Sequence, residues 1–171
     1  MNAALSTLTI THVAISLVGL VAGFLVLRGF LTGKSSLLQT NVFLVATIAT
    51  SVSGFLFPAQ QVTPANVLGV ISLVVLGIAV YAYFQEKLSR HWRTAYVVSV
   101  VVAQYLNFFV LVVQLFLKVP GLKALAPTQT EPAFAISQLA VLLGFVALGV
   151  LSVVRTRTLP NATKAGQLTH A

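Results

Sequence analysis

The chain of 171 residues is strongly apolar: hydrophobic residues make up 58% of it, charged residues only 7%, and the formal net charge is +8. An ordinary soluble domain carries about a quarter charged residues, so this composition excludes that class and indicates a membrane protein. The absence of cysteine excludes disulfides, thiolate catalysis and cysteine-ligated zinc or iron–sulfur sites. The basic residues stand beside apolar runs, so we interpret the positive charge as membrane orientation and expect no nucleic-acid partner.

Five apolar runs are long enough to cross a bilayer as helices, and polar or proline-containing connections separate them. We predict the spans at residues 9–31, 37–57, 65–84, 94–117 and 133–154. The expected fold is an all-α integral membrane protein, with residues 1–171 forming one transmembrane domain built as a five-helix bundle. Residues 155–171 are expected to form a loose basic tail in the cytoplasm.

The first span has a small and polar face made of His12, Ser16, Gly19 and Gly23. Gly19 and Gly23 form a GxxxG pattern, which lets another helix approach closely, so we expect them to serve helix packing. His12 lies near the start of the span. Two interpretations of it stay open: a wetted imidazole at the membrane interface, or an anchor for a ligand, a proton or a cofactor.

The second span carries a similar face, which consists of Thr47, Thr50, Ser51 and Gly54. Such residues permit close packing and hydrogen bonds between helices, and hydroxyls also bond to the preceding turn of their own helix. We therefore expect packing rather than chemistry from this face.

The fourth span carries three amides inside its apolar run, Gln104, Asn107 and Gln114. On a helix these amides and Lys118 fall within an arc of roughly 80°. An unpaired polar group in hydrocarbon costs roughly 1–3 kcal/mol or more, so this stripe should face protein, water or a ligand. The stripe leads into a proline-bounded loop, residues 118–132, within which residues 122–126 are expected to form a helical turn at the interface.

Basic residues are distributed unequally over the two sides that five spans define. One side carries only Lys118 and Lys123. The opposite side carries Arg28, Lys34, Lys87, Arg90, Arg93, Arg155, Arg157 and Lys164. The positive-inside rule therefore predicts the amino terminus outside the cell and the carboxyl terminus in the cytoplasm.

This topology gathers polar residues at the outer ends of the spans, where we expect a ligand site. The candidate ligand-binding residues are His12, Gln104, Asn107, Gln114, Lys118, Glu131 and Gln138. Glu131 is the only acid on that side, which removes two-carboxylate acid/base catalysis, and it could instead pair with Lys118, Lys123 or His12. One histidine and one glutamate do not make a tetrahedral zinc site. We predict no catalytic residue and no metal site, and the sequence assigns no cofactor.

The leading hypothesis is binding of a small amphiphile or solute, quinone- or lipid-like, without covalent chemistry. The expected site is a polar pocket that opens to the periplasm between the first, second, fourth and fifth spans, under the 118–132 loop. His12 would be the anchor, the three amides the hydrogen-bonding wall, and Lys118 with Glu131 the charged rim. Tyr105, Phe108 and Phe109 would form its apolar wall.

Two alternatives stay open. The chain could be an accessory or structural subunit of a membrane oxidoreductase or transporter complex, in which the amides only hold helices together. A solute could also pass along the amide stripe, and because five spans are few for a transporter, that function would require a homo-oligomer or a partner subunit.

Three stretches of the sequence are similar to a known family. They are TSVSGFLFP at residues 50–58, YLNFFVLVVQ at 105–114 and KVPGLKALAPTQTEP at 118–132. They resemble an uncharacterised family of short polytopic proteins of the bacterial inner membrane. The resemblance implies a location in that membrane, and it implies no activity, cofactor or catalytic residue.

Overall fold

The computed structural model describes residues 3–58, 64–84 and 90–158, and all regular structure in these ranges is helical. The helices are α1 (Ala3–Thr32), α2 (Leu37–Gly54), α3 (Pro64–Phe84), α4 (Arg90–Lys118), α5 (Pro120–Leu125) and α6 (Pro132–Thr158). All of these except the short α5 are long and apolar enough to cross a membrane. This confirms the prediction of an all-helical chain with five candidate spans.

The ends of four helices differ from the prediction: α2 ends at Gly54 instead of residue 57, α4 begins at Arg90 instead of residue 94, and α1 and α6 are longer than expected. α1 begins at Ala3 instead of residue 9, and the Thr9 hydroxyl donates to the Leu5 carbonyl within this added part. α6 continues to Thr158 and so includes Arg155 and Arg157, whose positive charges in the last turn suit the negative end of the helix dipole. The basic segment after the fifth span therefore begins in a helix. The rest of the predicted tail, from residue 159, lies outside the described residues, as does Lys87 in the third connection.

The expected helical turn in the 118–132 loop is present as α5. A proline at its first position has no N–H to leave unbonded and fixes a backbone angle that suits a helix start. Backbone hydrogen bonds join it directly to the end of α4, from Val119 to Leu115 and from Lys123 to Val119.

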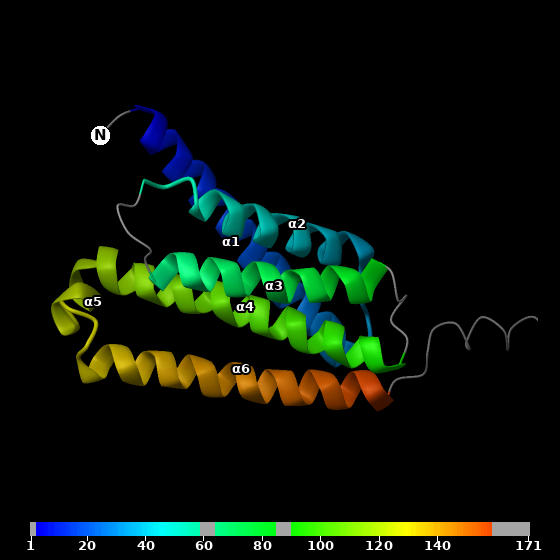
Figure 1. Cartoon of the computed structure of the whole chain (residues 1–171). Helices are drawn as coiled ribbons and strands as arrows, with labels where there is room; N and C mark the ends of the chain where they lie inside the picture. Colours follow the sequence, from blue (N-terminus) through cyan, green and yellow to red (C-terminus); the bar gives the residue numbers. More distant parts are fainter. Residues whose placement is uncertain (1–2, 59–63, 85–89, 159–171) are drawn as a thin grey trace, which may run out of the picture.

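The long helices run in alternating directions through the bundle (Figure 1). The start of α1, the end of α2, the start of α3, the end of α4 and the start of α6 therefore lie at the end of the bundle where α5 is found. We call this end the α5 end. α4 is central, because it contacts α1, α3, α5 and α6, whereas α2 packs mainly on α1.

The main apolar core lies between α1, α2, α3 and α4, around the fully buried side chains of Phe43, Leu76 and Val100. A smaller cluster closes the α5 end, where Phe116 of α4 packs edge-on against Phe134 of α6 at 5.4 Å. α6 is the least embedded of the long helices, and Phe145 is its one buried large apolar side chain. α6 packs on α4 and on α1, and it leaves most of its remaining surface outside the core of the bundle.

Candidate functional site

Gln104 of α4 lies deepest among the predicted site residues, with 0% of its surface exposed. Its Nε2 donates to the carbonyl of Leu20 on α1 at 2.9 Å. Gly23 makes room for this contact, because a Cβ at that position would overlap the Gln104 amide. Gln104 Oε1 has no hydrogen-bond partner among the described residues, and its position against Gly23 leaves it only the weak Cα–H donors of the glycine. Gln104 therefore joins α4 to α1.

Asn107 lies one turn nearer the α5 end and joins α4 to α2. Its Nδ2 donates to the hydroxyl of Thr47 at 3.2 Å, and Thr47 is fully buried. Thr47 in turn faces Gly19 of α1, where an added Cβ would lie 3.3 Å from the hydroxyl oxygen. The two glycines of the GxxxG pattern thus admit different neighbours: Gly19 admits α2 and Gly23 admits α4. The packing role predicted for them agrees with this geometry.

His12 lies between α1 and α2, in the part of α1 that reaches the α5 end. Its Nδ1 is 2.8 Å from the Ser53 hydroxyl, and Ser53 donates to the Thr50 carbonyl at 3.1 Å. Ser53 has one hydroxyl hydrogen: when it donates to Thr50, His12 Nδ1 is the donor to Ser53, and in the other tautomer Ser53 donates to Nδ1. Phe57 packs edge-on against the ring at 5.2 Å. The imidazole is therefore held in one orientation.

Two hydroxyls that the sequence reasoning missed complete these contacts. Ser53 is the partner of His12, and Ser72 of α3 accepts from Ser51 of α2 at 3.1 Å. Ser72 is buried and stands within a long apolar run. An isolated hydroxyl in such a run could have predicted from the sequence that Ser72 bonds another helix. We call the interhelical contacts of His12, Thr47, Ser51, Gln104 and Asn107 the polar seam. The polar seam connects α1, α2, α3 and α4, and each of its hydrogen bonds joins a side chain of one helix to a neighbouring helix.

The outer half of the predicted amide stripe does not join the polar seam. Gln114 and Lys118 are exposed in the last turns of α4. The stripe therefore divides into two parts, with Gln104 and Asn107 turned to other helices and Gln114 and Lys118 turned outward. The arc of about 80° that the stripe occupies is wide enough for its members to meet different surroundings.

Glu131 forms the turn that precedes α6 and makes no ion pair within residues 90–158. Its Oε1 accepts from the Thr128 amide and hydroxyl at 3.1 and 2.9 Å, and its Oε2 accepts from the Thr130 amide at 3.1 Å. The expected pairing with Lys118 or Lys123 is thus replaced by hydrogen bonds inside the loop. Desolvation raises the pKa of Glu131. The hydrogen bonds from Thr128 and Thr130 lower this pKa by more than desolvation raises it, so it lies below its ordinary value.

The lowered pKa of Glu131 predicts a loop that loosens in acid. A carboxylate whose pKa is depressed by folding stabilises the structure above its unfolded pKa of about 4.5, and the contribution is lost as the pH falls through the lower folded value. We expect amide hydrogen exchange of Thr128 and Thr130, corrected for intrinsic rates, to accelerate below about pH 4.5. Glu131→Gln should exchange quickly at every pH. Equal pH profiles for the two proteins would contradict the prediction.

Gln138 and Gln129 fasten the α6 side of the molecule to backbone carbonyls of α4. Gln138 Nε2 donates to the Phe109 carbonyl at 3.3 Å, and Gln129 Nε2 donates to the Val113 carbonyl at 3.1 Å. Gln129 adopts a positive φ of 61°, which glutamine rarely does, so its side-chain bond helps to hold a tight turn. Sequence reasoning missed Gln129. Gln138 Oε1 is buried and has no hydrogen-bond partner among the described residues.

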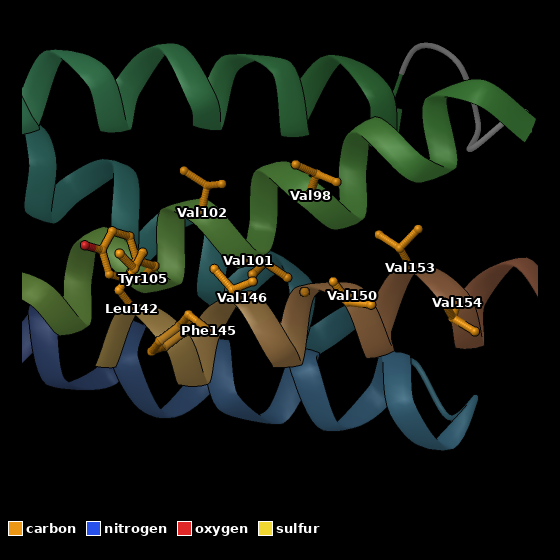
Figure 2. Close-up of a pocket in the computed structure, with 11 residues that line it drawn as sticks. Val98, Val101, Val102, Tyr105, Leu142, Phe145, Val146, Val150, Val153 and Val154 are labelled. Carbon is orange, nitrogen blue, oxygen red and sulfur yellow. The ribbon is translucent and has the colours of Figure 1, made fainter. Parts of the chain in front are cut away.

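An apolar groove of about 390 Å³ lies between α4 and α6. Valines of both helices line it, with Tyr105 and Leu142 at one end and Val154 at the other (Figure 2). The predicted pocket was polar and lay between four spans, so this groove differs from it in lining and in place. Tyr105 is the one residue of the expected apolar wall that lines the groove.

Comparisons with known protein families, with curated proteins and with solved structures found no match. Residues 3–58, 64–84 and 90–158 hold no cluster of three or more histidines and acids that would suit a metal ion. Composition, helix length and helix number define the class of the chain, which is an integral membrane protein with several spans.

Proposed function

We propose that this protein lies in the bacterial inner membrane with its amino terminus in the periplasm, and binds a small quinone- or lipid-like amphiphile in the α4–α6 groove. The proposal of a bacterial membrane rests on the resemblance of residues 50–58, 105–114 and 118–132. The orientation rests on charge: Lys118 and Lys123 lie at the α5 end, whereas the other basic residues of the described ranges belong to the opposite helix ends.

The observation that carries the proposal is the apolar groove within the membrane-spanning part of α4 and α6. Its α6 side runs from Leu142 to Val154, which corresponds to a rise of about 18 Å, more than half of a hydrocarbon core of about 30 Å. A long apolar chain entering sideways from the bilayer fits such a groove without losing hydrogen bonds. Gly149 lines the groove, and a Cβ at this position would lie 3.3 Å from a methyl carbon of Val101, so the glycine also lets α6 approach α4 closely.

The predicted site residues take different roles in this proposal. His12, Gln104 and Asn107 hold α1, α2 and α4 together and do not touch the apolar chain. Gln138 lies at the α5 end of α6, on the side that meets α4, and is the proposed polar contact. Lys118, at the end of α4, and Glu131, in the loop before α6, stay proposed as the rim near the membrane surface.

Filling the groove tests this function. Gly149→Leu should lower binding of added decylubiquinone and of hexadecanol by about tenfold or more, because the new side chain fills the groove and presses on Val101 across it. Gly144→Leu is the matched control, since a Cβ at Gly144 meets nothing within 4 Å. Native mass spectrometry of protein released from nanodiscs measures both. Equal binding by the two variants would rule the groove out as the site.

A second candidate function, an accessory or structural subunit of a membrane complex, is favoured by the polar seam. Each amide that points inward binds another helix, as expected of residues that hold a scaffold together. In that case the wild-type protein would carry neither probe, and Gly149→Leu would leave its lipid content unchanged.

A further inference from the structure

We propose that the bundle binds the head group of an anionic phospholipid at the end opposite the α5 end, where Arg157 of α6 meets Thr94 of α4. The ligand class is a phosphodiester with a net negative charge, such as that of phosphatidylglycerol. The site takes a head group only and needs no ligand in the α4–α6 groove, so it does not depend on the proposed function.

Arg157 and Thr94 bring the ends of two helices together. Arg157 Nε donates to the Thr94 hydroxyl at 3.4 Å, which joins the last turn of α6 to the second turn of α4. A guanidinium group carries five N–H donors, and four of them belong to its two terminal nitrogens. Arg157 is exposed, so these donors stay accessible while the Nε bond orients the group. Such a planar pair of nitrogens fits two oxygens of one phosphate.

The depth of this contact matches the head-group layer of a bilayer. α6 has 27 residues, which corresponds to a length of about 40 Å, whereas the hydrocarbon core is about 30 Å thick. The last turn of α6, with Arg157, therefore extends into the head-group layer. The ring of Trp92, two residues before Thr94, packs at 5.0 Å from the ring of Tyr81, and such rings gather at the membrane–water interface. The phosphate of a lipid lies at the same level.

The charge at this end favours an anionic lipid over a zwitterionic one. The sequence places eight basic residues and one acid, Glu86, on this side of the five spans. The one carboxylate side chain within the described ranges, Glu131, belongs to the loop at the α5 end. A cationic surface attracts an anionic head group, whereas the ammonium group of a choline lipid gains nothing from it. A free phosphate ion shares this chemistry, but only a lipid is held at this depth by its acyl chains.

The test compares dioleoyl phosphatidylglycerol with dioleoyl phosphatidylcholine, which have the same acyl chains, in nanodiscs that contain equal amounts of both. Native mass spectrometry of the full-length protein measures which lipid stays bound. We expect the wild-type protein to retain phosphatidylglycerol about fivefold more, and Arg157→Gln to reduce this preference to about twofold or less. Arg155→Gln is the matched control and should keep the preference. It removes the same charge from the same turn, but Arg155 leaves α6 about 200° away from Arg157, on the opposite side of the helix.

Each outcome decides for or against the site. Loss of the preference in Arg157→Gln with its retention in Arg155→Gln supports the site. Equal loss in the two variants shows a diffuse attraction between lipid and the basic end and overturns the site, as does equal retention of both lipids by the wild-type protein. Displacement of phosphatidylglycerol by millimolar inorganic phosphate overturns the assignment to a lipid. Decylubiquinone binding reports on the groove alone, so its absence would refute the proposed function and leave this site standing.

Discussion

Gly23→Ala is expected to destabilise the bundle by about 1 kcal/mol. The added Cβ would overlap the Gln104 amide, which is fully buried, so the side chain must move and lose its bond to the Leu20 carbonyl. A buried polar group left without its partner costs about 1–3 kcal/mol. The usual gain of about 1 kcal/mol from replacing a helical glycine with alanine offsets only part of this loss. Unfolding in mixed micelles with increasing dodecyl sulfate measures the difference.

A double-mutant cycle with Gln104→Ala shows whether Gln104 is the cause. In that background the space above Gly23 is empty, so Gly23→Ala should be neutral or stabilising. Gly77→Ala on α3 is the matched single control, because nothing lies within 4 Å of an added Cβ there. If Gly23→Ala were as harmless as Gly77→Ala, the close approach of α1 and α4 at this point would be refuted.

Phe145→Ala is expected to loosen α6 and to cost about 2 kcal/mol. Phe145 is the one large apolar side chain that α6 buries, and its ring packs at 5.8 Å from the rings of both Tyr105 and Phe108. Comparable changes in soluble proteins cost about 3–5 kcal/mol, but lipid is as apolar as the protein interior. Only the packing loss and the cavity therefore remain in a membrane. The same unfolding assay applies.

Local loosening distinguishes this effect from general instability. Hydrogen exchange should increase along α6 in Phe145→Ala, whereas α2 and α3, whose main packing partners are α1 and α4, should keep their protection. Leu143→Ala, two residues away and 60% exposed, should leave both stability and exchange unchanged. Uniform exchange in every helix of Phe145→Ala would show that α6 is no separate unit.

The sequence by itself determined the class of the protein, the number of spans and the positions of most helices. Five apolar runs of span length have no other stable form in lipid than helices, since every backbone polar group must be bonded internally. Prolines marked helix boundaries, since Pro58 follows the end of α2, and Pro120 and Pro132 are the first residues of α5 and α6. The GxxxG pattern of Gly19 and Gly23 also predicted close helix contacts, because glycine has no side chain to prevent them.

Only the tertiary structure decided which partner each polar residue meets. Helical periodicity gives the angle at which Gln104, Asn107 and Gln114 leave α4, but the neighbour found at that angle depends on where α1 and α2 pack. Gln104 and Asn107 therefore meet helices, and Gln114 does not. The groove between α4 and α6 could not be predicted from the sequence either. Its valines have the pattern of ordinary membrane-facing residues, and only the packing of the two helices side by side makes them line a groove.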